Sequence, residues 1–141
     1  MSSTQEQNED VVRRFITETD RGNPEILLEV MTEDARWHLG GATLDRESLL
    51  AASKSFNAAF PDLKHGLEDL FAVGDRVVMR GVNSGTHTGE FMGLAPTDRS
   101  VKFGILIIFR LEEGRIAEAW EEADVLGLLA QLGVKVPPDA T

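Results

Sequence analysis

Cysteine is absent from this sequence of 141 residues. Its absence excludes a disulfide framework, a thiolate nucleophile and a zinc–thiolate site. Long apolar runs are missing as well, since the run that begins at Ile105 is far too short to cross a bilayer. The first residues also lack the basic and apolar regions of a signal peptide. We therefore expect a water-soluble, cytoplasmic protein without membrane contact.

Basic side chains are scarce, with 14 Lys and Arg against 24 Asp and Glu and a formal net charge of −10. Such a surface repels phosphate backbones, so we expect no nucleic-acid partner. The three histidines are scattered without carboxylates at ligand spacing, and no metal site is predicted. The loops GxGxxG, GxxxxGKS/T and GxSxG, typical of nucleotide binding and serine hydrolysis, are also missing.

Helical signals fill the first part of the chain. Ser3 and the glutamate three residues later form a capping box, and apolar residues then recur at helical spacing to about Arg21. Pro24 suits the first position of a short second helix. A third helix is predicted after the cap residue Asp45 and ends at Pro61.

From residue 62 the pattern changes to segments rich in β-branched and aromatic residues, which predict an antiparallel meander of four strands. The strand Val101–Leu111 has apolar residues on both faces and is predicted to be central. A last helix follows Asp124 and ends at Gly133, with a tail from about residue 134. The order of elements predicts one α+β domain over residues 1–141, in which a cone-shaped, curved antiparallel sheet wraps around the N-terminal helices.

Two histidines are candidates for a functional site. His87 lies between two threonines and two glycines, and glycines within a strand mark a bulge or a close approach of ligand or backbone. It is either a working residue or a surface histidine that stabilises a turn. His38 adjoins Trp37 in a short extended segment, so only one of these two side chains can face inward. His38 either lines a cavity or makes a hydrogen bond in the core, whereas His65 has little context and is predicted at the surface.

The segment EAWEEAD contains the second candidate. Strand alternation would place Glu118, Trp120, Glu122 and Asp124 on one face. A carboxylate beside an indole has an apolar neighbour that raises its pKa towards the range of a general acid or base. Asp124 also precedes the last helix directly, so it can equally be no more than the cap of that helix.

Two arginines, Arg80 and Arg110, interrupt apolar strands, where an unpaired charge is costly. Each is expected to have a carboxylate partner, for which Glu118, Glu122 and Asp69 are candidates. The alternative role is to anchor an anionic or carbonyl group of a substrate.

The order and spacing of three segments resemble the SnoaL-like ester cyclases, or polyketide cyclases, of the nuclear transport factor 2-like superfamily. The segments are FPDL at 60–63, GDRVVMRGVNSGTHTGEFMGLAPTDRSV at 74–101 and IIFRLEEGRIAEAWEEADVLGLLAQLG at 107–133. Many relatives have PTGR where this chain has Pro96–Arg99. Asp98 takes the position of that glycine, and aspartate tolerates a positive φ there.

The resemblance implies a cystatin-like α+β barrel around an apolar pocket, a homodimer, and chemistry without a cofactor. It also implies an intramolecular aldol reaction in which Asp124 is the general acid/base. His87 or Arg110 would then polarise a carbonyl or hold the enolate oxygen. The predicted pocket residues are Trp37, His38, Phe60, Arg80, Phe91, Met92, Glu118 and Trp120.

Two alternatives share the same pocket. One is a module that binds a small apolar ligand without chemistry. The other is an epoxide or lactone hydrolase, which needs a second carboxylate such as Glu118 or Asp69 close to Asp124. In either case the two apolar faces of strand Val101–Leu111 predict a homodimer, since helices can cover only one of them. The contact would involve Phe103, Ile105 and Ile107 or their opposite-face neighbours Leu106 and Ile108.

Overall fold

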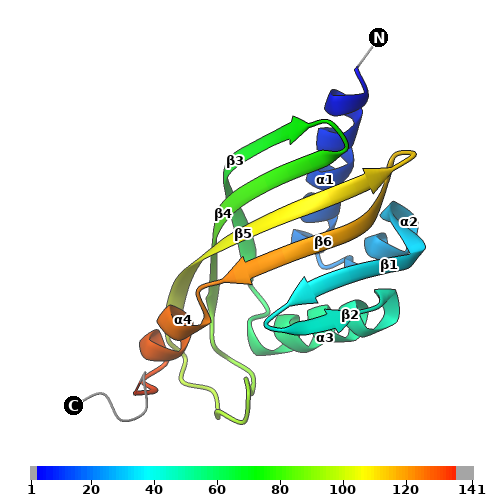
Figure 1. Cartoon of the computed structure of the whole chain (residues 1–141). Coiled ribbons are helices and arrows are strands. Elements are labelled where there is room, and N and C mark those ends of the chain that lie inside the picture. Colours follow the sequence, from blue (N-terminus) through cyan, green and yellow to red (C-terminus); the bar gives the residue numbers. More distant parts are fainter. Residues whose placement is uncertain (1–2, 136–141) are drawn as a thin grey trace.

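The computed structural model describes residues 3–135 and consists of a six-stranded sheet with helices packed on one of its faces (Figure 1). The helices are α1 (Thr4–Asp20), the single 3-10 turn η1 (Pro24–Ile26), α2 (Leu27–Val30), α3 (Arg46–Ala59) and α4 (Val125–Gln131). The strands are β1 (Met31–Leu39), β2 (Ala42–Leu44), β3 (Lys64–Val73), β4 (Arg76–Thr86), β5 (Ser100–Glu112) and β6 (Arg115–Ala123).

The predicted helix caps are present. The Ser3 side chain accepts a hydrogen bond from the backbone N–H of Glu6, and Asp45 accepts one of 2.8 Å from Ser48. These bonds satisfy N–H groups that have no partner inside the helix. None of the helices among residues 3–135 has the length and apolar character needed to span a membrane.

The sheet has the strand order β2-β1-β6-β5-β4-β3. The predicted meander is confirmed, since β3, β4, β5 and β6 pair antiparallel in sequence order and β5 is central. The prediction of a purely antiparallel sheet was wrong, because β1 pairs parallel to β6. The elements between β1 and β6 return the chain so that β6 lies beside β1 and runs in the same direction. β2 pairs antiparallel with β1 and forms the edge of the sheet. The α+β class and the curved sheet around the helices are confirmed, and the sheet does not close into a barrel.

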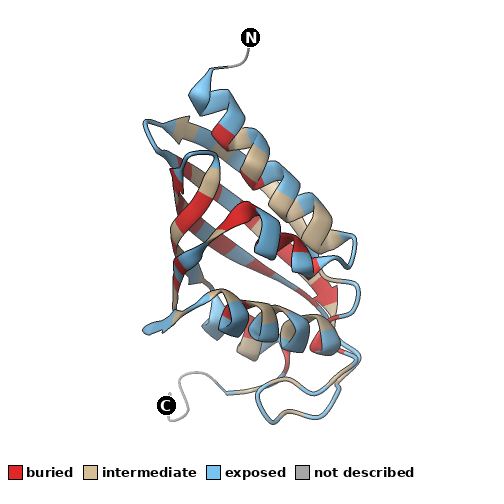
Figure 2. Ribbon diagram, turned by 90° about the vertical axis from the view of Figure 1, so that its right-hand side faces the viewer, coloured by how far each residue is buried: buried red, intermediate tan, exposed pale blue. Residues whose placement is uncertain are grey.

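The inner face of the sheet and the inward sides of the helices form the core. Alternate β5 residues are all buried, namely Val101, Phe103, Ile105, Ile107, Phe109 and Leu111. Figure 2 shows these buried segments between α1 and α3, whose outward sides are exposed. Each Å² of buried apolar surface stabilises the folded state by about 25 cal/mol, so this face is the main source of stability.

The outer face of the sheet carries a row of apolar and aromatic side chains that we call the outer-face band. Strand register aligns one residue from each of five strands, and the band consists of Phe71, Val78, Ile108, Trp120 and His38. In the described chain no helix covers this face. Phe71 of the band is 49% exposed, and Leu106, which lies two residues before the band residue Ile108, is 43% exposed. Phe103, Ile105 and Ile107 are covered by the chain's own helices, so only the Leu106 and Ile108 side of β5 is open for a dimer contact.

Candidate functional site

A carboxyl group lies on the inner face of the sheet, at Glu121. This residue pairs with Ile107 of β5, which in turn pairs with Met79 of β4, so its neighbours across the sheet are apolar. Its Oε1 accepts a 2.9 Å hydrogen bond from the indole N–H of Trp37. The residue keeps some accessible surface, as a group that meets a substrate must.

Burial raises the pKa of the Glu121 carboxyl above its ordinary value, and two smaller effects oppose this shift. The hydrogen bond from Trp37 and the charge of His65 both stabilise the carboxylate and lower the pKa. A raised pKa favours the protonated carboxyl, and a shift in this direction moves a carboxyl towards the range required of a general acid or base.

Trp37, which donates to this carboxyl, belongs to an aromatic cluster. Trp37 packs edge-on against Phe15 and Phe109, with centroid separations of 5.8 and 5.7 Å, and the two phenyl rings are 6.2 Å apart. Trp37 is only 3% exposed and Phe109 is fully buried. Such a cluster is closely packed, so it holds the indole N–H in place.

A cleft of about 440 Å³ opens between α1 and β3, beside His65. The Asp20 carboxylate accepts hydrogen bonds from the backbone N–H of His65 at 3.0 Å and from its ring Nδ1 at 2.5 Å. Across the strand pair His65 faces Asn83, whose buried Oδ1 has no hydrogen-bond partner within residues 3–135. The charge of His65, which lines this cleft, also acts on the carboxyl of Glu121.

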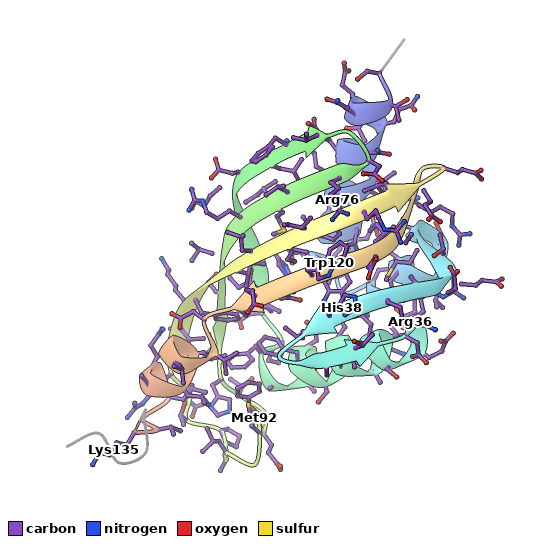
Figure 3. All side chains as sticks on the ribbon, in the orientation of Figure 1. Arg36, His38, Arg76, Met92, Trp120 and Lys135 are labelled. Carbon is purple, nitrogen blue, oxygen red and sulfur yellow. The ribbon has the colours of Figure 1, made fainter. Side chains whose placement is uncertain are left out.

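Several residues predicted to line the pocket lie instead on the outer face of the sheet. Figure 3 shows Arg76, Trp120 and His38 together on the side away from α1. His38 stacks on Trp120 at 5.6 Å, and the guanidinium of Arg76 lies 5.0 Å from the centre of the Trp120 ring. The predicted alternation of β6 is present, but the face that carries Glu118 and Trp120 is the one opposite Glu121.

The charged residues of this outer face pair with one another. Glu118 binds His38 Nε2 at 2.7 Å and Arg110 Nη2 at 3.3 Å. Both contacts lower the pKa of Glu118, and the hydrogen bond with His38 has the larger effect. Arg110 also binds Glu112 at 2.7 Å, and these carboxylates raise the pKa of its guanidinium. Arg80 binds Asp69 at 2.7 Å. Both arginines therefore have the carboxylate partners that the sequence predicted.

Asp124 has the capping role that the sequence allowed. It is exposed, and its Oδ1 accepts a 2.9 Å hydrogen bond from the N–H of Gly127 in the first turn of α4. It follows the end of β6 and does not lie beside Glu121 on the inner face of that strand. The structure does not bring Asp124, His87 and Arg110 together.

His87 is fully buried just beyond the end of β4. Its Nδ1 accepts a hydrogen bond from the N–H of Thr97, so the neutral ring carries its proton on Nε2, which has no partner within residues 3–135. Phe60 stacks on the ring at 5.4 Å, and Phe91 lies 6.5 Å away. Met92, in the same loop, is 70% exposed.

The loop after β4 makes the close backbone approach that the glycines beside His87 predict. A Cβ at Gly89 would lie 2.1 Å from the carbonyl oxygen of Ala58, which no larger residue tolerates. Asp98 has a φ of 58°, as expected for a residue in place of glycine at this turn. His87 thus belongs to a small aromatic core beside α3. His87 is far from Glu121 along the sheet. Met79 of β4 is in register with Ile107 and Glu121, and a straight strand from Met79 to His87 would be roughly 26 Å long.

The sequence profile of the SnoaL-like polyketide cyclases matches residues 9–132. The chain belongs to this family. No curated protein matches it. Among solved structures, it is similar to IdmH of Streptomyces antibioticus, a proposed polyketide cyclase, with 36% identity and a TM-score of 0.82 over 91% of this chain and 99% of IdmH.

Two further structures share the fold. TsrD of Streptomyces laurentii is 28% identical with a TM-score of 0.83, over 94% of this chain and 98% of TsrD. A proposed SnoaL-like polyketide cyclase of a Jannaschia species is 24% identical with a TM-score of 0.87, over 96% of this chain and 97% of that chain. Family and neighbours together support a function of the cyclase or isomerase type.

Sequence reasoning missed three residues of this candidate site, namely Glu121, His65 and Asp20. A signal for Glu121 existed, since strand alternation from the small residues Ala117 and Ala119 places it on their face. No sequence signal joined Asp20 to His65, because they are 45 residues apart and meet only when α1 packs on β3.

Proposed function

We propose that this protein is a cofactor-independent cyclase in which Glu121 is the general acid/base. The family match and the likeness to IdmH support a cyclase-type activity. The observation that carries the proposal is the carboxyl of Glu121, which the Trp37 indole holds on the apolar inner face of the sheet and whose pKa is raised by burial.

The reaction that suits this group is an intramolecular aldol addition. The Glu121 carboxylate removes a proton from a carbon next to a carbonyl, and the resulting enolate carbon forms a bond to a second carbonyl carbon of the same molecule. The new alkoxide then takes the proton from the Glu121 carboxylic acid. Atoms and charge balance, so one carboxyl completes the cycle.

The surroundings of Glu121 suggest the substrate class of this proposal. Its neighbours across the sheet, Ile107 and Met79, are apolar, and the Trp37 indole donates to its carboxyl. A polyketide-like or cyclic molecule suits such surroundings, because apolar contact places the reacting carbon while a few polar groups fix its orientation.

Two other functions remain alternatives. A module that only binds a ligand would use the same interior but would not depend on the carboxyl of Glu121. A hydrolase would need two neighbouring carboxylates, whereas Asp69 and Glu118 are bound to Arg80 and Arg110 on the outer face. The site geometry therefore supports the cyclase best.

We also infer that the protein forms a homodimer through the outer-face band. The band is a row of apolar and aromatic side chains across five strands, with His38 at one end, and charged residues flank it. Two copies related by a two-fold axis would cover each other's band.

Proton abstraction can be tested without the natural substrate. We choose 2-tetralone, an apolar ketone with acidic carbon-bound protons, and follow its deuterium uptake in D₂O by proton NMR. The wild type should accelerate exchange, and Glu121→Gln should remove this acceleration by a factor on the order of 10² to 10⁴. Unchanged exchange in Glu121→Gln would remove Glu121 from the mechanism.

A further inference from the structure

A ring of basic side chains surrounds the cleft between α1 and β3. Arg13 lies on α1, Arg21 caps the end of that helix, and Lys64 begins β3, and all three line the cleft with His65. The chain as a whole carries a net charge of −10. The charge at this opening is therefore opposite in sign to that of the protein, a pattern that concentrates anions locally.

Few carboxylates form ion pairs with this ring, although Asp62 lies near enough to Lys64 for their charges to interact. Arg21 binds Glu18 at 3.2 Å, and Asp20, the acidic side chain of the lining, is bound to His65. Within residues 3–135 neither Arg13 nor Lys64 forms a salt bridge. By contrast Arg14, the next residue of α1, binds Glu29 at 2.7 Å. Arg13 and Lys64 thus leave positive charge available at the opening.

Apolar side chains lie within the same cleft. Ile16 of α1 and Leu67 of β3 line it between the basic residues. Both are partly buried and pack against the hydrophobic core. A ligand that enters here therefore meets positive charge at the rim and apolar surface further in.

We propose that this cleft selects an amphiphilic organic carboxylate. The carboxylate binds Arg13 and Lys64, and the apolar part lies along Ile16 and Leu67. The inference rests on the proposed function, because it takes the cleft as the entrance to that site. It adds that the substrate carries an anionic group remote from the reacting carbon, since a second negative charge beside Glu121 would oppose ionisation of that carboxyl.

The test uses two matched probes, 2-naphthoate and the neutral 2-naphthalenemethanol. Each is titrated into the full-length, nitrogen-15-labelled protein, and binding is followed by the amide shifts of the cleft residues Ile16, His65 and Leu67. Naphthoate should bind more tightly than the alcohol, and added salt should weaken its binding. Arg13→Gln and Lys64→Gln should each raise the naphthoate Kd by about two- to fivefold and leave the alcohol unaffected. Arg14→Gln is the matched control and should bind naphthoate like the wild type.

Three results would overturn the inference. They are equal binding of the two probes, naphthoate affinity that Arg13→Gln and Lys64→Gln do not change, and the absence of naphthoate-induced shifts at the cleft. None of them bears on tetralone exchange by Glu121, so the failure of this inference is distinguishable from failure of the proposed function. Conversely, selective naphthoate binding with unchanged exchange in Glu121→Gln would leave an anion-binding cleft without the proposed chemistry.

Discussion

The indole N–H of Trp37 donates a 2.9 Å hydrogen bond to the carboxyl of Glu121, a residue 84 positions later in the chain. The parallel pairing of β1 with β6 brings the two residues together on the inner face. The bond fixes the direction of the carboxyl while burial raises its pKa. On the opposite, outer face of the same two strands, Glu118 binds His38.

The raised pKa of Glu121 has a consequence for stability. Folding favours the protonated carboxyl, so the free energy of unfolding should fall as the pH rises from the pKa of an unfolded glutamate, about 4.3, through the higher pKa of the folded protein. Urea unfolding measured over this window should show a steeper loss in the wild type than in Glu121→Gln. The difference between the two proteins isolates this group from Glu118, whose lowered pKa acts in the opposite direction. Parallel curves would contradict the assignment.

Asp124 should matter for folding and not for turnover. Asn caps helices about as well as Asp, so Asp124→Asn should keep both stability and the rate of tetralone exchange. Asp124→Ala removes the cap and should cost about 1 kcal/mol in urea unfolding. If Asp124→Asn abolished exchange while keeping its fold, the general base implied by family resemblance would be the correct one.

Arg110 should be dispensable for chemistry, because its guanidinium binds Glu112 and Glu118 on the outer face. Arg110→Gln should lower stability by about 0–1 kcal/mol, as is typical of partly exposed ion pairs. Its tetralone exchange should equal that of the wild type when the rates are compared per folded molecule. A selective loss of exchange would return Arg110 to the catalytic set.

His87 should act through the packing of its loop. Replacing it by Gln disturbs the buried bond with Thr97 and the stack on Phe60, and it should cost about 1–3 kcal/mol in thermal or urea unfolding. Exchange per folded molecule should stay within a factor of about two. A large fall in exchange without loss of stability would instead make the unpartnered Nε2 a substrate contact.

The dimer prediction is tested at Leu106, which adjoins the outer-face band and is 43% exposed. Sedimentation at micromolar concentration should give twice the chain mass of 15.5 kDa for the wild type. Leu106→Glu should give a monomer, because a buried unpaired charge is costly at an apolar contact. Leu126→Glu on α4, at a position 63% exposed, is the control and should remain dimeric. A monomeric wild type would contradict the prediction.

Local signals predicted most of the fold. The caps at Ser3 and Asp45, the alternation of Val101–Leu111 and the helix after Asp124 depend on neighbours within a few residues, and all are present. The parallel pairing of β1 with β6 could not be predicted in this way, because it joins segments about 80 residues apart. The short strand β2 was missed as well.

The site was harder to predict than the fold. Alternation correctly separated Glu118 and Trp120 from their neighbours, but it could not tell which face of β6 turns inward. That choice follows from the packing of Trp37 against Phe15 and Phe109, which is a tertiary contact. A carboxyl is costly to bury, and that cost gives no reason to expect Glu121 on the inner face, although functional groups are the usual exceptions to that rule.

The titration of Glu121 tests the central claim most directly. Carbon-detected NMR of the wild type, with Glu121→Gln to assign the resonance, reports the pKa of this carboxyl in the intact protein. We predict a pKa above that of an ordinary glutamate, and below the value found in Trp37→Phe, which lacks the indole donor. A wild-type pKa at or below the ordinary value of about 4.3 would show that the carboxyl is solvated, and would contradict its role as the buried acid/base.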